Sequence, residues 1–103
     1  MEFKDLQDAV VKNGESYGQR YNIKIDEDFA LLKLYEEVGE FSQALLIHKG
    51  KCRPEKLETE EKSKEHLGQE MADVLGLLMM NAHLLDIDLE ENLKKKWINR
   101  EKQ

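Results

Sequence analysis

Hydrophobic side chains recur every three or four residues in four stretches of the chain, which is the spacing of amphipathic helices. No stretch alternates apolar and polar residues with the β-branched enrichment that is typical of a strand. The pattern predicts an all-α fold with helices over residues 2–12, 26–48, 63 to 84 or 85, and 88 to the end. Irregular connections are expected over 13–25, which is rich in Gly, Asn and Tyr, and over the charged stretch 50–61.

Residues at the predicted helix ends support these boundaries. Asp26 is a suitable N-cap for the second helix, and Lys49-Gly50 is a stop signal after His48. The fourth helix begins at Asp88, where Asp88-x-x-Glu91 resembles a capping box. The connection over 50–61 is expected to be partly helical at most.

The second and third predicted helices are apolar around most of their circumference. Their apolar residues are Leu31, Leu32, Leu34, Tyr35, Val38, Phe41, Leu45, Leu46 and Ile47 in one, and Met71, Val74, Leu75, Leu77, Leu78, Met79, Met80 and Leu84 in the other. Such helices must be covered on several sides. Four helices in one small chain cannot easily do this, so we expect a bundle completed by homo-oligomerisation, as a dimer or a dimer of dimers.

Composition narrows the class of protein. A chain of 103 residues, 40% hydrophobic and 37% charged, is expected to form one globular domain over residues 1–103. The net charge of −6 argues against a duplex nucleic-acid binder. No apolar run approaches the roughly 20 residues of a membrane span, and Cys52 is the single cysteine. With no signal-peptide pattern at the N-terminus, the expectation is a cytoplasmic protein without a membrane partner.

Two acidic motifs lie within the two apolar helices. On the second helix, Glu40 lies about 40° and Glu37 about 100° around the axis from Glu36, so the three share one arc. On the third helix, Glu70 and Asp73 are separated by three residues and project from one face. If the two helices pack antiparallel, the five carboxylates converge.

Converging carboxylates require compensation, because unpaired charge among apolar neighbours is costly. Lys33 is the only basic residue within a turn of the first motif, so a divalent cation is the expected partner. Oxygen ligands favour Mg²⁺, with Mn²⁺ as the alternative, and carboxylate-bound Mg²⁺ typically completes its shell with water and substrate phosphates. A di-iron bundle would need Glu-x-x-His pairs, and none of the three histidines follows a Glu at that spacing.

The motifs Glu-Glu-x-x-Glu at 36–40 and Glu-x-x-Asp at 70–73 resemble those of the all-α nucleoside triphosphate pyrophosphohydrolases, the MazG-like superfamily. The stretch Lys-x-x-Asn-Arg-x-Lys at 96–102 is similar to the basic motif of its dCTP pyrophosphatase-like branch. The resemblance covers roughly residues 26–102. Two departures are the long separation between the acidic motifs, positions 41–69, and the missing Tyr-Pro-type continuation after the basic motif.

The resemblance implies a role for each matching residue. The implied metal ligands are Glu37, Glu40, Glu70 and Asp73. Glu36 would bind a further ion or orient the attacking water, so that Glu36 and Glu37 are the catalytic candidates. The implied phosphate-binding residues are Lys96, Asn99, Arg100 and Lys102. The implied reaction is attack of water on the α-phosphorus of a nucleoside or deoxynucleoside triphosphate, which releases the monophosphate and pyrophosphate and would serve nucleotide-pool housecleaning.

Several other residues permit two interpretations. Asn81 either reads a base edge or forms hydrogen bonds within the bundle, and His66 either supports a metal ligand or faces solvent. Trp97 either packs the fourth helix onto the bundle or stacks on a base. Further candidates for the base pocket are Phe3, Tyr17 and Tyr21.

Two non-enzymatic hypotheses remain beside the hydrolase. One is a helical oligomer that binds nucleotide or a protein partner without catalysis and keeps the acidic motif for ion binding. The other is an accessory subunit of a larger complex, for which the apolar helices would provide surface. Turnover of a triphosphate in the presence of Mg²⁺ separates the hydrolase from both.

Overall fold

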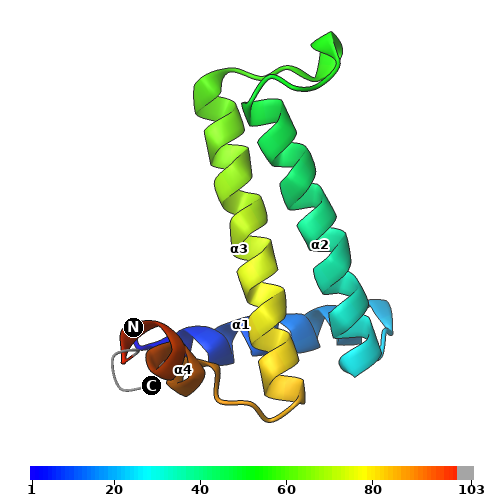
Figure 1. Ribbon diagram of the computed structural model, residues 1–103. Helices are drawn as coiled ribbons and strands as arrows, with labels where there is room; N and C mark the ends of the chain where they lie inside the picture. The colour runs from blue at the N-terminus through cyan, green and yellow to red at the C-terminus, as the bar shows by residue number, and fades with distance from the viewer. Residues whose placement is uncertain (100–103) are drawn as a thin grey trace.

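The computed structural model describes residues 1–99, and all regular structure within them is helical, which confirms the all-α expectation. The elements are α1 (Phe3–Tyr21), α2 (Glu27–His48), the 3₁₀ turn η1 (Pro54–Lys56), α3 (Glu60–Leu84), α4 (Leu89–Leu93) and the π-helical turn η2 (Lys94–Ile98). Helices α2 and α3 form an antiparallel hairpin, and α1 lies across its lower end (Figure 1). The antiparallel arrangement assumed for the acidic motifs is therefore present.

The boundaries of α2 and α3 follow from their caps. The side chain of Asp26 accepts a hydrogen bond from the backbone N–H of Phe29 at 2.9 Å, as predicted for an N-cap. Helix α3 begins three residues earlier than predicted, because the Thr59 hydroxyl accepts from the backbone N–H of Lys62 at 3.2 Å. Near the top of the hairpin, His48 Nδ1 lies 2.8 Å from Ser63 Oγ and ties the end of α2 to α3.

The first helix is longer than the sequence pattern indicated, and the prediction of an irregular connection over 13–25 was wrong for most of that range. Helix α1 continues through Asn13 and Gly14 to Tyr21. Gly14 packs against the end of the Met80 side chain, and Gly18 packs against Ile25 and the backbone oxygen of Ile23. Gly14 thus allows close packing of α1 against α3, Gly18 allows the connection after α1 to fold back on it, and neither glycine ends the helix.

The core of a single chain is small. Among the described residues, the buried hydrophobic side chains are Val11, Ala30, Ala44, Met79, Met80 and Ala82. Val11, Ala30 and Met80 form one cluster where α1, α2 and α3 meet, with Ile25 and Leu84 packed against it. The hairpin above this junction is held mainly by its two helices alone (Figure 1).

Much apolar surface of the hairpin is therefore uncovered. Leu32 and Tyr35 on α2 are 67% and 66% exposed, and Met71 on α3 is 54% exposed. The radius of gyration is 16.3 Å, whereas a compact domain of this length has about 13 Å. The accessible surface of 8231 Å² is roughly a third larger than the size of the chain predicts.

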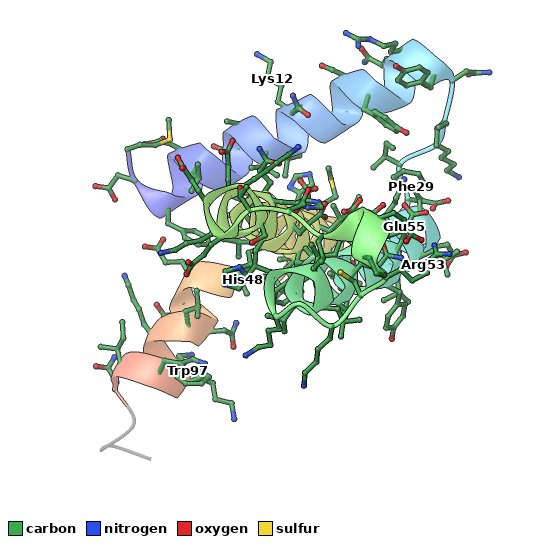
Figure 2. All side chains as sticks on the ribbon, turned by 90° about the horizontal axis from the view of Figure 1, so that it is seen from above. Lys12, Phe29, His48, Arg53, Glu55 and Trp97 are labelled. Atoms are coloured by element: carbon green, nitrogen blue, oxygen red, sulfur yellow. The ribbon has the colours of Figure 1, made fainter. Side chains whose placement is uncertain are left out.

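The fourth helix differs from its predicted form. Asp88 caps α4 by accepting from the backbone N–H of Glu91 at 2.9 Å, as the sequence indicated. The α-helix then gives way to the π-helical turn η2, in place of a continuous α-helix. Trp97 stands at the outer end of this segment and is exposed, so it does not pack α4 onto the bundle of its own chain (Figure 2).

None of the helices among residues 1–99 combines the length and the apolarity that crossing a membrane requires.

We expect Gly18→Ala to destabilise the protein more than Gly14→Ala. A Cβ at Gly18 would lie 2.8 Å from the backbone oxygen of Ile23 and 2.6 Å from the Ile25 side chain, and the backbone cannot easily retreat. A Cβ at Gly14 meets only the terminal methyl of Met80, which can move aside. Urea denaturation at matched protein concentration should show a loss of about 1–3 kcal/mol for Gly18→Ala. Gly14→Ala should stay within about 1 kcal/mol of wild type, because alanine is the better helix former.

Candidate metal centre

Three carboxylates from the two arms of the hairpin meet near its middle. Glu37 comes from α2, and Glu70 and Asp73 come from α3. One oxygen from each lies within 4.8 Å of the others. The convergence predicted from the two acidic motifs is therefore present for these three side chains.

Two oxygens of this cluster are buried without a partner. Glu37 Oε2 and Glu70 Oε2 are inaccessible to solvent and have no hydrogen-bond partner within the described residues. Buried polar atoms in folded proteins are normally paired, and buried carboxylate oxygens are among the costliest to leave alone. The cluster therefore lacks a positive or donating group at its centre.

The pKa of Glu37 also reflects the burial of this carboxylate among other acidic groups. Its pKa is raised to about 7, first because burial disfavours the charged form. The neighbouring Glu40 carboxyl is the second cause, and repulsion from Asp73 and Glu70 adds to it. Near neutral pH, the Glu37 side chain is thus poised between its protonated and ionised forms.

The other two acidic candidates lie outside the set of three. Glu40 is exposed and faces Glu37 from the next turn of α2, where it contributes to the shift of the Glu37 pKa. Glu36 is exposed and its Oε1 accepts from Lys33 Nζ at 2.8 Å. Glu40 therefore lies next to Glu37, as the shared helical arc predicted, whereas Glu36 forms an ion pair with Lys33.

The acidic cluster fits a small oxygen-preferring cation. In an octahedral Mg²⁺ shell with bonds of about 2.1 Å, adjacent oxygens lie about 3.0 Å apart and opposite ones about 4.2 Å. The three carboxylate oxygens lie within 4.8 Å of one another, so the side chains would have to close in to share one ion. The two buried oxygens without partners are the atoms that such an ion would satisfy.

Two pockets flank the cluster where α1 meets the hairpin. The first, about 210 Å³, reaches Glu37, and its lining is mainly apolar. The second, about 280 Å³, reaches Asp73. Both pockets are lined by Asn13, Gly14, Leu77 and Met80. Each pocket is therefore lined by one member of the acidic cluster and by residues of α1 and α3.

Aromatic residues line the pocket beside Glu37. Tyr17 of α1 and Phe29 of α2 both face it, with ring centroids 6.5 Å apart. Of the three aromatic candidates for a base pocket, Tyr17 therefore lies in this place, and Tyr21 contacts Tyr17 at a centroid distance of 4.9 Å. Phe3 lines a different pocket, between the start of α1 and the end of α3.

Sequence reasoning missed two residues of this pocket. Phe29 and Lys33 both line it, and they precede Glu37 by eight and four residues on α2. Residues four apart on a helix share a face, so this spacing was a signal that could have found them.

Asn81 forms hydrogen bonds within the bundle. Its Nδ2 donates to the backbone oxygen of Leu77 at 2.8 Å and to that of Ala30 at 3.1 Å. Both donor hydrogens of the amide are thus directed at backbone oxygens of α3 and α2. This geometry agrees with the interpretation that Asn81 forms hydrogen bonds within the bundle.

The described part of the basic motif lies away from the acidic cluster within one chain. Lys96 and Asn99 lie in and just after η2, which follows α4, and α4 lies beside the lower part of α3, near the start of α1 (Figure 1). From Asp73 to the end of α3 at Leu84, the helix itself rises about 16 Å in the opposite direction from the hairpin loop. Arg100 and Lys102 lie outside the described residues.

Comparisons with protein-family models, with curated proteins and with solved structures found no match to this chain. The resemblance to the MazG-like enzymes therefore stays a prediction from the motifs at 36–40, 70–73 and 96–102.

We expect the stability of the metal-free protein to fall as the pH rises from about 4.5 to about 7. In the folded protein the Glu37 pKa is raised to about 7 from an ordinary 4.5, so the folded state binds this proton more tightly than the unfolded state does. Glu37→Gln should remove this contribution to the pH dependence, whereas Glu36→Gln should retain it. Thermal melting in EDTA across this range measures both. Equal slopes for wild type and Glu37→Gln would contradict the prediction.

Proposed function

We propose that this chain is a Mg²⁺-dependent hydrolase that converts a nucleoside or deoxynucleoside triphosphate to the monophosphate and pyrophosphate. The observation that carries the proposal is the meeting of Glu37, Glu70 and Asp73, with two buried oxygens left without a partner, beside an aromatic-lined pocket. A cation site next to a pocket with stacking surfaces suits a ligand that has both a polyphosphate and a base.

In this proposal, Glu37, Glu40, Glu70 and Asp73 hold the cation. When bound, it would neutralise phosphate charge and make a water molecule more acidic. The pKa of Glu37 near 7 would let its carboxyl exchange a proton at neutral pH. Glu36 could orient the attacking water only after its ion pair with Lys33 opens, since that pair occupies Glu36 Oε1.

The pocket beside Glu37 is the proposed place of the base. Tyr17 and Phe29 supply aromatic faces, and the lining is predominantly apolar, as stacking on a base requires. Lys33 lines the same pocket as Glu37, and its Nζ is 2.8 Å from Glu36 Oε1. In the proposal, Lys33 lies between the base and the phosphates. A base bound here would direct its triphosphate along α2 toward the acidic cluster.

The proposed working form is a homo-oligomer built on the outer faces of α2 and α3. The exposed apolar residues of the hairpin, among them Leu32, Tyr35 and Met71, would be covered by the same residues of a second copy. The accessible surface exceeds that of a compact chain by roughly 2,000 Å², which is the area per partner that an extensive obligate interface buries.

An oligomer also offers a route for the basic motif. Within one chain, η2 leads away from the hairpin, and Trp97 at its outer end is exposed (Figure 2). A second copy packed along the hairpin could place its own Lys96 and Asn99 near the acidic cluster. We therefore propose that the phosphates are held by the basic motif of a neighbouring copy.

A pyrophosphate-release assay over canonical and modified ribo- and deoxyribonucleoside triphosphates tests the activity. We expect release with Mg²⁺, none with EDTA, and preference for one base. Asp73→Asn should lower the rate by more than about 100-fold. It removes a proposed metal ligand, and the loss of a ligand should cost more than the 10–100-fold that is typical for a residue that only supports a ligand. The melting temperature of Asp73→Asn should be equal to or higher than that of wild type, because the substitution relieves repulsion between carboxylates.

The matched control is Asp86→Asn. Asp86 lies in the turn after α3, at the other end of the helix, and adopts a φ of 55° that asparagine tolerates. It should retain wild-type activity. Absence of pyrophosphate release from every triphosphate, by protein that is folded and binds nucleotide, would support the non-catalytic binding hypothesis in place of the hydrolase.

Mixing two inactive variants tests whether the site is shared between copies. Asp73→Asn lacks the acidic half and Lys96→Ala lacks the basic half. After the two are unfolded together and refolded, half of the dimers are hybrids, and each hybrid contains one intact site if the halves come from different copies. The mixture should then recover about a quarter of wild-type activity. A mixture that stays inactive, or a monomer in light-scattering measurements, would contradict the shared site.

A further inference from the structure

His66 lies between two carboxylates from different parts of the chain. Its Nε2 is 3.3 Å from Oε1 of Glu70, one turn further along α3. Its Nδ1 is 3.5 Å from Oε1 of Glu58, which belongs to the connection before α3. The imidazole ring therefore links the connection between α2 and α3 to one member of the acidic cluster.

The two oxygens of Glu70 have different surroundings. Oε1 faces His66, and Oε2 is buried without a partner and belongs to the carboxylate that meets Glu37 and Asp73. The Glu70 side chain is only 15% exposed. A contact at one oxygen restricts the rotation of the whole carboxylate, so His66 limits where the other oxygen can point.

Glu58 lies on the opposite side of the ring. Its side chain is 22% exposed, and its Oε1 is buried without a hydrogen-bond partner among the described residues, 3.5 Å from His66 Nδ1. A neutral imidazole carries one N–H and can donate to only one of the two carboxylates, and Glu70 is the nearer one. The ring therefore lies between two carboxylates, with its closer contact to Glu70.

We propose that His66, flanked by Glu58, is a positioning residue that presents the Glu70 carboxylate to the cation. The inference rests on the proposed function, because it assumes that Glu70 is a ligand. It extends that function by making part of the connection, through Glu58, a support of the metal centre. Groups that orient metal ligands from behind typically contribute 10–100-fold to metal affinity.

Mn²⁺ binding, measured by electron paramagnetic resonance of the free ion, tests this role without an activity assay. We expect His66→Ala to weaken binding by about 10-fold or more. Glu58→Gln should weaken it less, because the ring keeps its contact with Glu70. His66→Gln should recover part of the affinity lost in His66→Ala, since its amide can still donate to Glu70. That partial recovery separates positioning from mere packing.

His83→Ala is the matched control. His83 lies near the other end of α3 and lines the pocket between α1 and α4. Circular dichroism should show equal helix content in all variants. Wild-type affinity in both His66→Ala and Glu58→Gln would overturn the positioning role and leave the proposed function standing. Wild-type protein that fails to bind Mn²⁺ would overturn the proposed metal centre and this inference together.

Discussion

The mutual repulsion of carboxylates at the middle of the α2–α3 hairpin is the constraint to which the rest of the site responds. Glu37, Glu70 and Asp73 are held together by the packing of two antiparallel helices, with two buried oxygens unsatisfied. The pKa of Glu37 is raised first by burial and then by the neighbouring carboxylates, and the proton that it retains lowers the local charge. A divalent cation, as proposed for this site, would lower the local charge further than a proton does.

The hairpin that creates this cluster is also the least covered part of the chain. Only the lower end is packed against α1, through Val11, Ala30 and Met80. Above that junction, apolar residues such as Leu32 and Tyr35 are exposed on the outer faces. The proposed cation site and the proposed homo-oligomer therefore depend on the same two helices. Helices α2 and α3 hold the acidic residues, and a second copy would cover their outer faces.

Helix α1 connects the fold to the site. Gly14 leaves room for Met80 of α3, and Gly18 leaves room for the turn at Ile23 after α1. This packing places Tyr17 opposite Phe29 and forms the pocket beside Glu37. The glycines that seemed to mark an irregular connection thus help to form the proposed base pocket.

The sequence by itself determined the helical class, the span of α2, the end of α3 and the two acidic motifs, because caps and helical periodicity are local properties. It could not determine the continuation of α1, since a glycine that ends a helix and one that permits close packing look alike until the partner is known. Nor could it assign Glu36 to Lys33, Glu40 to the edge of the cluster, or Glu58 to His66. Those pairings depend on side-chain directions and on contacts between distant segments, which only the tertiary structure decides.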